Sequence, residues 1–327
     1  MQASDFRGLY AIIPTPAVPG ADSLTARTTV ALDETERLVS NLIRDRSSGL
    51  IILGTTGECA TLTQDEYRGF VDCVARTVKK RIPLFVGATA LGAHEVRDRL
   101  AFAQEQGADG TLLGLPMWQP CTTEMAVRYY ADIAAAFPHL PIMVYANARA
   151  FRFAFPTEFW AGVVAEAPTV IAAKSGVVGK LKDNLAATAK RIHFMPNDMF
   201  IADFHALSPD TTTACWATAA AMGPEPCVAI VEAASANNIA DLRAISDRIA
   251  WTNAPLDPIF SDLETFARYN IQLEKTRIAE AGYCKPGPVR PPYNFFPDDL
   301  AELSRECGRR WRQLRAEFVP QVASLAV

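Results

Sequence analysis

Short apolar runs and amphipathic segments alternate eight times in the first 224 residues, and this alternation limits the fold more than any other feature. Strands that alternate with helices form a parallel sheet. The runs that predict strands are 8–16, 49–57, 83–90, 110–117, 141–147, 169–176, 193–198 and 211–219. Helical spacing of apolar residues marks most of the segments between them, and Thr63 with Glu66 has the spacing of a capping box.

Eight such units predict a closed parallel barrel, the (β/α)8 or TIM barrel, and we assign residues 1–224 to it as the catalytic domain. An open doubly wound sheet is the alternative, although no GxGxxG or GxxxxGK[ST] loop follows the first strand. Residues 225–327 are expected to form a C-terminal helical extension packed on the barrel. Its predicted helices are 226–235, 239–252, 257–280 and 297–318, with a turn-rich connector at 285–292.

Composition limits the class of protein. The net charge of −4 and the lack of a basic run argue against nucleic-acid binding. No apolar stretch reaches the ~18 residues that span a bilayer, and the N-terminus lacks the pattern of a secretory signal. The seven cysteines are scattered without a CxxC pair, and the four histidines lack metal-site spacing. We therefore expect a cytoplasmic protein with free thiols, no membrane segment and no metal site.

The run TVIAAKSG, residues 169–176, ends in a lysine that points to chemistry. Lys174 falls at the end of a strand that is apolar on both faces, where loss of water lowers the pKa of an amine. A lysine with a pKa of about 7–8 can attack a ketone and form a Schiff base. The alternative is that Lys174 only extends its charged end to solvent.

Other polar residues follow the strands that end at the same rim, where barrel enzymes place their chemistry. The sequence GTTGE at 54–58 predicts a loop whose free N–H groups and threonine hydroxyls bind a carboxylate, or else an ordinary glycine turn. Tyr145 can relay a proton and Asn147 can orient a water molecule, unless the tyrosine only packs under a loop. Trp118 and Trp216 could form an aromatic pocket or belong to the core.

Several motifs make the chain similar to the pyruvate-dependent class I aldolase family, which includes dihydrodipicolinate synthase and N-acetylneuraminate lyase. The motifs shared with the whole family are GTTGE, the tyrosine at 145 and the lysine at 174. The chain most resembles the hydratase-aldolases of aromatic-hydrocarbon catabolism of the naphthalene and phenanthrene type. The segments that carry this likeness are GTTGECATLT (54–63), LGLPMW (113–118), YANARAF (145–151), AAKSG (172–176), RYNIQLEKTRIAEAG (268–282) and GPVRPPYN (287–294).

The resemblance implies a carbon–carbon lyase that adds water to trans-o-hydroxybenzylidenepyruvate, or a similar ortho-substituted compound, and cleaves it to salicylaldehyde and pyruvate. Because the iminium on the lysine takes up the electrons, neither a metal nor an organic cofactor is expected. Family members commonly form homotetramers, and the same is expected here. The expected catalytic residues are Lys174, Tyr145 and Thr56, and the expected substrate-binding residues are Thr55, Gly57, Asn147, Trp118, Trp216 and Asn270.

Two departures from the synthases of the family favour a flat aromatic substrate. The arginine that those enzymes carry five residues after the tyrosine is Ala150 here, with Arg149 and Arg152 beside it, and Met117-Trp118 replaces a tyrosine pair. The alternatives are a 2′-carboxybenzalpyruvate hydratase-aldolase giving 2-carboxybenzaldehyde, and a dihydrodipicolinate-synthase-like or sugar-acid aldolase. A non-catalytic 2-oxo-acid-binding protein and a structural assembly protein are two further hypotheses.

Overall fold

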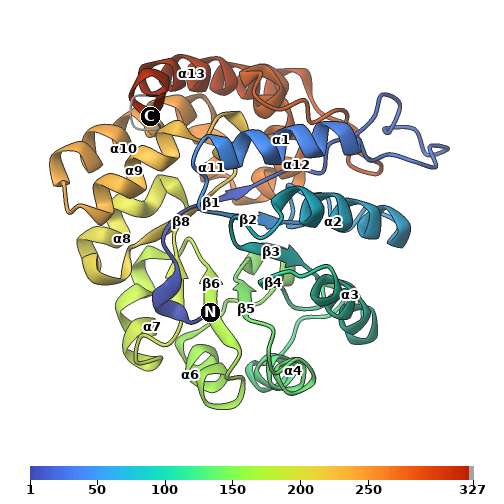
Figure 1. The fold of residues 1–327 in the computed structure, drawn as a ribbon, viewed down its shortest axis with the longest axis vertical. Helices are drawn as coiled ribbons and strands as arrows, with labels where there is room; N and C mark the ends of the chain where they lie inside the picture. Colours follow the sequence, from blue (N-terminus) through green and yellow to red (C-terminus); the bar gives the residue numbers. More distant parts are fainter. Residues whose placement is uncertain (324–327) are drawn as a thin grey trace.

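The computed structural model describes residues 1–323, with side chains through residue 319, and its centre is a ring of eight parallel strands (Figure 1). The strands are β1 (Gly8–Ile12), β2 (Gly49–Ile52), β3 (Leu84–Gly87), β4 (Gly110–Leu113), β5 (Ile142–Tyr145), β6 (Val170–Lys174), β7 (His193–Met195) and β8 (Ala214–Ala217). Neighbours in the chain pair in parallel, and β1 also pairs with β8. The Trp216 N–H joins β8 to β7 by donating to the Pro196 carbonyl at 2.9 Å. The predicted barrel is confirmed, and the doubly wound alternative is wrong.

Helices surround the ring and cover its outer face (Figure 1). They are α1 (Leu32–Arg44), α2 (Gln64–Val78), α3 (Ala93–Glu105), α4 (Thr123–Ala136), α5 (Ala148–Phe151), α6 (Thr157–Glu166), α7 (Leu181–Ala187), α8 (Ile201–Leu207), α9 (Glu225–Ser235), α10 (Ile239–Asn253), α11 (Asp257–Ser261), α12 (Leu263–Ala281) and α13 (Asp298–Ala323). The short helix α5 was not expected. None of the helices described is long and apolar enough to cross a membrane.

The prediction of one helix over 257–280 is wrong, because the chain breaks at Asp262. The Asp262 carboxylate accepts the N–H groups of Glu264 and Thr265 at 3.1 and 3.3 Å, which caps a new helix, α12. Aspartate side chains compete for backbone groups in this way and favour helix starts. The segment is therefore two helices, α11 and α12, that meet at Asp262.

The C-terminal helices pack on the barrel and on one another. Helix α9 contacts β1 and β8, and α13 packs along α12, α10 and α9 (Figure 1). The division into a barrel ending at residue 224 and an extension over 225–327 stays a prediction. Residues 324–327 of that extension lie outside the described residues.

The lower part of the barrel is filled by aromatic side chains. Phe6 stacks on His193 with ring centroids 5.2 Å apart and also contacts Tyr10 and Phe85. A Cβ atom at Gly49 would lie 2.5 Å from the Tyr10 ring, so this strand position admits only glycine. Burial lowers the pKa of His193 to about 3, so the imidazole is neutral in this core. The interior is therefore packed, and open space is left at the C-terminal ends of the strands.

The capping box at the start of α2 is confirmed and gives a stability prediction. The Glu66 N–H donates to the Thr63 hydroxyl at 3.3 Å, and the Thr63 N–H donates to the Glu66 carboxylate at 3.0 Å. Thr63→Ala should lower the free energy of unfolding by about 1 kcal/mol, because one N–H group of the first turn loses its acceptor. The measurement is urea unfolding followed by circular dichroism. Ser235→Ala, at an exposed position at the end of α9, is the control and should leave the midpoint unchanged.

Candidate active site

The ends of strands β5, β6 and β8 bring a tyrosine, a lysine and a tryptophan together. Lys174 on β6 is paired in register with Tyr145 on β5. The Lys174 Nζ lies 4.7 Å from the centroid of the Tyr145 ring and 3.4 Å from that of Trp216 on β8. The lysine therefore points to the rim where the other expected groups lie, enclosed by aromatic faces.

This enclosure changes the protonation of the amine. Burial lowers the pKa of Lys174 from 10.5 to about 7. The Glu274 carboxylate opposes this shift, and the Arg149 guanidinium adds to it. A large share of Lys174 is therefore neutral at neutral pH, which is the form that attacks a carbonyl carbon.

The Tyr145 hydroxyl is the centre of a short hydrogen-bond chain. It lies 2.8 Å from the Thr55 hydroxyl, and the Asn147 amide donates to it at 3.3 Å. Asn147 is fixed in turn, because its Oδ1 accepts the Ala150 N–H at the start of α5. Burial raises the pKa of Tyr145, which keeps the phenol protonated, while the bonds from Thr55 and Asn147 oppose this. The hydroxyl bonded to Tyr145 belongs to Thr55; the help expected from Thr56 stays a prediction.

The loop after β2 has the geometry of an anion site. The N–H groups of Thr56 and Gly57 have no acceptor among the described residues, the Thr55 N–H interacts with the Tyr145 hydroxyl, and the Glu58 N–H donates to the Thr55 carbonyl at 2.9 Å. A Cβ atom at Gly57 would lie 2.8 Å from the backbone of Leu53, so the turn can close only with glycine. Successive free N–H groups of this kind form a nest for a carboxylate.

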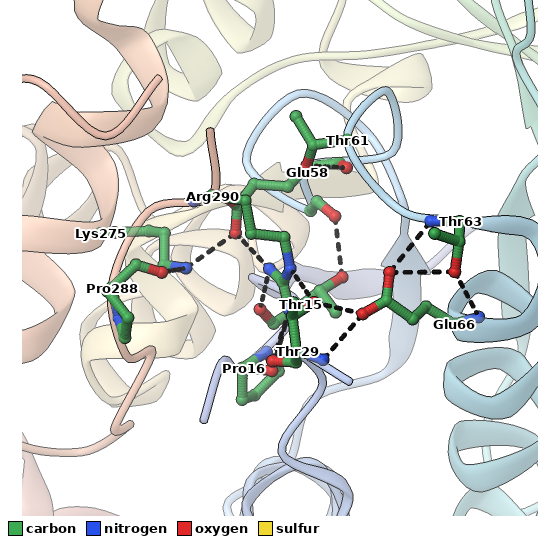
Figure 2. A network of polar contacts seen from close by, with 11 residues as sticks. Thr15, Pro16, Thr29, Glu58, Thr61, Thr63, Glu66, Lys275, Pro288 and Arg290 are labelled. Carbon is green, nitrogen blue, oxygen red and sulfur yellow. Dashed lines mark hydrogen bonds and ion pairs between the residues drawn. The ribbon is translucent and has the colours of Figure 1, made fainter. Parts of the chain in front are cut away.

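Behind this loop lies a buried ionic cluster that sequence reasoning missed, shown in Figure 2. The Glu58 carboxylate accepts from Lys275 Nζ and from Arg290 NH1, both at 2.7 Å, and from the Arg290 N–H at 2.8 Å. Arg290 also donates to Thr29 Oγ1 and to the Thr15 carbonyl, and the Thr15 hydroxyl donates to the Gly57 carbonyl at 2.7 Å. Burial lowers the pKa of Lys275, and the Glu58 carboxylate opposes this. Lys275 lies in the motif LEK and Arg290 in the motif GPVRPP. Membership of these motifs was the only sign in the sequence that the two residues have a specific role.

A cavity of about 210 Å³ opens beside Tyr145 and under α12. Its lining is largely apolar apart from the hydroxyls of the barrel rim and the polar side chains of α12. Residues of this lining include Thr55, Met117, Tyr145, Phe151, Asn270 and Ile271. The cavity thus has room for a flat ring next to the Tyr145 hydroxyl.

The structure brings together most, but not all, of the expected site residues. Lys174, Tyr145, Thr55, Asn147 and Trp216 are linked by the contacts above, and Asn270 lines the same cavity as Tyr145. Trp118 lies apart, with 78% of its surface exposed, in a hollow that it shares with Leu91 and Met125. No group of three or more metal-ligating side chains occurs within the described part of the chain.

The comparison with known proteins gives the class of the chain. The Dihydrodipicolinate synthetase family matches residues 21–295, so the chain belongs to this family. It is 38% identical over 325 residues to the trans-O-hydroxybenzylidenepyruvate hydratase-aldolase of Pseudomonas aeruginosa, covering 97% of this chain and 96% of that protein.

Two further relatives extend the likeness along almost the full length. The trans-2′-carboxybenzalpyruvate hydratase-aldolase of Nocardioides sp. (strain KP7) is 36% identical, with 98% of this chain and 97% of that protein covered. The solved structure "PhdJ bound to substrate intermediate" has a TM-score of 0.94 and 33% identity, and the match covers 98% of this chain and 99% of that chain. The resemblance found in the motifs is therefore confirmed.

The lowered pKa of Lys174 can be tested without any substrate. Acetylation of Lys174 by acetic anhydride should rise with pH around a midpoint of about 7, because only the neutral amine reacts. Arg149→Met should raise the midpoint, since the Arg149 charge disfavours protonation of Lys174. The measurement is the acetylated fraction of the Lys174 peptide by mass spectrometry. Arg152→Met is the control, because Arg152 donates to the Met117 carbonyl instead. A midpoint near 10.5 would contradict the assignment.

Proposed function

We propose that the protein is a Schiff-base hydratase-aldolase that adds water to trans-o-hydroxybenzylidenepyruvate and cleaves the product to salicylaldehyde and pyruvate. The observation that carries this is the enclosed Lys174 amine beside Tyr145 and next to a loop with free N–H groups. The hydratase-aldolases matched over nearly the whole chain support the same reaction class. The protein is thus a carbon–carbon lyase that acts in the degradation of aromatic hydrocarbons.

The first half of the proposed reaction forms the electron sink. The substrate carboxylate binds the N–H groups of Thr56 and Gly57. The neutral Lys174 amine adds to the ketone, and the Tyr145 phenol gives its proton to the departing hydroxide, so that water leaves and an iminium remains. The iminium draws electrons through the conjugated double bond. Water, oriented by Asn147, then adds across this bond and places its hydroxyl on C4.

The second half breaks the carbon–carbon bond. The Tyr145 phenolate, helped by the threonine hydroxyls, takes the proton of the C4 hydroxyl, and the C3–C4 bond breaks with its electrons moving to the iminium. The aromatic aldehyde leaves, and the remaining enamine takes a proton at C3. Water then hydrolyses the imine, which releases pyruvate and the free Lys174 amine. Asn270 and Trp216 are proposed to contact the aryl group, whereas Trp118, also expected there, lies apart on the surface.

The assembly and location of the protein are part of the same proposal. The exposed apolar side chains Leu91, Trp118 and Met125 gather around one hollow, a surface that a second copy of the chain can cover. This supports a homo-oligomer, with the tetramer of the family as the expected form. A cytoplasmic location agrees with the seven free cysteines.

Trapping with borohydride tests the central step. Incubation with pyruvate and borohydride should add one reduced pyruvate to Lys174, measured by intact mass, and Lys174→Ala should abolish the adduct. A 2-oxo-acid-binding protein without catalysis, or a structural protein, would give no adduct in the unchanged chain.

Tyr145→Phe separates the proton relay from covalent binding. This variant should keep the adduct but turn over about 10²–10⁴ times more slowly, the usual size of general acid–base catalysis. Tyr129→Phe, on α4 and outside the site, is the control and should keep its rate. Normal turnover by Tyr145→Phe would overturn the role given to this residue.

A substrate panel decides between the related functions. Loss of the enone absorbance should be fastest with trans-o-hydroxybenzylidenepyruvate and slower with trans-2′-carboxybenzalpyruvate. Condensation of pyruvate with aspartate semialdehyde should not be detected. Preference for the carboxylated ring would favour the second hydratase-aldolase, and turnover of aspartate semialdehyde would favour the synthase.

A further inference from the structure

The cluster behind the loop 54–58 holds two cations in direct contact with one carboxylate. Lys275 and Arg290 both contact the same carboxylate oxygen of Glu58 at 2.7 Å. The side chains of both cations are 2% exposed, and that of Glu58 is 0% exposed. Charges buried this deeply are strongly disfavoured unless they are compensated. Two buried cations therefore need more compensation than Glu58 alone supplies.

A second acidic side chain joins the network through a bridging hydroxyl. Glu66 is the next carboxylate in Figure 2, and it accepts the Thr29 N–H at 2.8 Å and the Thr63 N–H at 3.0 Å. It also accepts from the Thr29 hydroxyl, which itself accepts from Arg290 Nε at 2.6 Å. Lys275 and Arg290 thus offset the two carboxylates behind the loop, and loss of either cation would leave negative charge there.

The loop directs its free groups toward such a ligand. Two of its carbonyls accept hydrogen bonds: the Thr15 hydroxyl donates to Gly57 O at 2.7 Å, and the Glu58 N–H donates to Thr55 O at 2.9 Å. Its N–H groups at Thr56 and Gly57 stay without an acceptor in the described chain. An anion bound there would sit next to the residue whose carboxylate the two cations share.

We propose that Lys275 and Arg290 are positioning residues of the carboxylate site. They hold the loop through Glu58, and their positive charge offsets the buried carboxylates, so that the carboxylate of the 2-oxo acid is not repelled from the N–H groups. This inference rests on the proposed function, since it assumes that Lys174 reacts with a 2-oxo acid whose carboxylate lies on the loop. Lys275 and Arg290 thereby make the C-terminal part of the chain, far from the loop in sequence, a component of substrate recognition.

The test compares two ketones that differ in the carboxylate. Pyruvate carries one and acetone does not, and both can form an imine that borohydride traps on Lys174. Lys275→Met keeps the Glu58–Arg290 ion pair and removes one positive charge behind the loop. The pyruvate concentration for half-maximal trapping should rise about tenfold, as expected for loss of one nearby charge in a partly buried site, while trapping of acetone changes little. A merely structural defect would weaken trapping of both ketones together.

Two further variants make the result decisive. Lys275→Gln keeps a donor for Glu58 and Pro288 and removes only the charge, so it tests the inference if the methionine variant does not fold. Arg315→Met is the matched control, because Arg315 pairs with Glu225 at 2.7 Å and has no contact with the loop. This variant should prefer pyruvate over acetone to the same degree as the unchanged protein.

The outcomes separate this inference from the proposed function. If the unchanged protein traps no pyruvate, the Schiff-base function itself is overturned. If the unchanged protein traps pyruvate but the Lys275 variants keep the same preference over acetone, the function stands and the role of the cluster is overturned.

Discussion

Removal of water from one amine is the constraint on which the proposed chemistry depends. An exposed lysine has a pKa of about 10.4 and is almost entirely charged at neutral pH. The Lys174 amine is less strongly protonated, because it lies inside the barrel rim and the rings of Tyr145 and Trp216 take the place of solvent beside it. Its pKa falls to about 7 as a result of this burial.

The second physical theme is that polar groups from distant parts of the sequence are tied together inside the protein. Glu58 follows β2, Lys275 lies on α12, and Arg290 lies between α12 and α13. Their ion pairs link the loop 54–58 to the C-terminal helices. Replacing all partners of such a buried ion pair by apolar residues changes the free energy of unfolding little. Removing one partner alone is strongly destabilising, because it leaves a buried charge without compensation. The cluster is therefore better understood as fixing the position of the loop than as strengthening the fold.

The fold was largely predictable because its signals are local. The barrel strands are short runs that are apolar on both faces, and the helices between them have one apolar face. This pattern of residues along the chain was enough to predict all eight strands. The failures were also local in origin. Asp262 divides a segment with continuous helical spacing because its carboxylate bonds two N–H groups, and the four-residue helix α5 is too short to show a period. Strand ends were placed too late, as at Leu53, where a φ of 60° turns the chain away from the sheet.

By itself, the sequence determined the parallel barrel and the rim on which its strand ends meet, and it predicted Lys174 and Tyr145 as reactive groups there, because a parallel barrel collects all its strand ends on one side. Only the tertiary structure decided that Thr55 bonds Tyr145, that Trp216 covers the amine while Trp118 faces the surface, and that Lys275 and Arg290 share Glu58. These facts depend on distances between residues far apart in the chain. Such distances follow from packing and burial, which no local pattern of residues encodes.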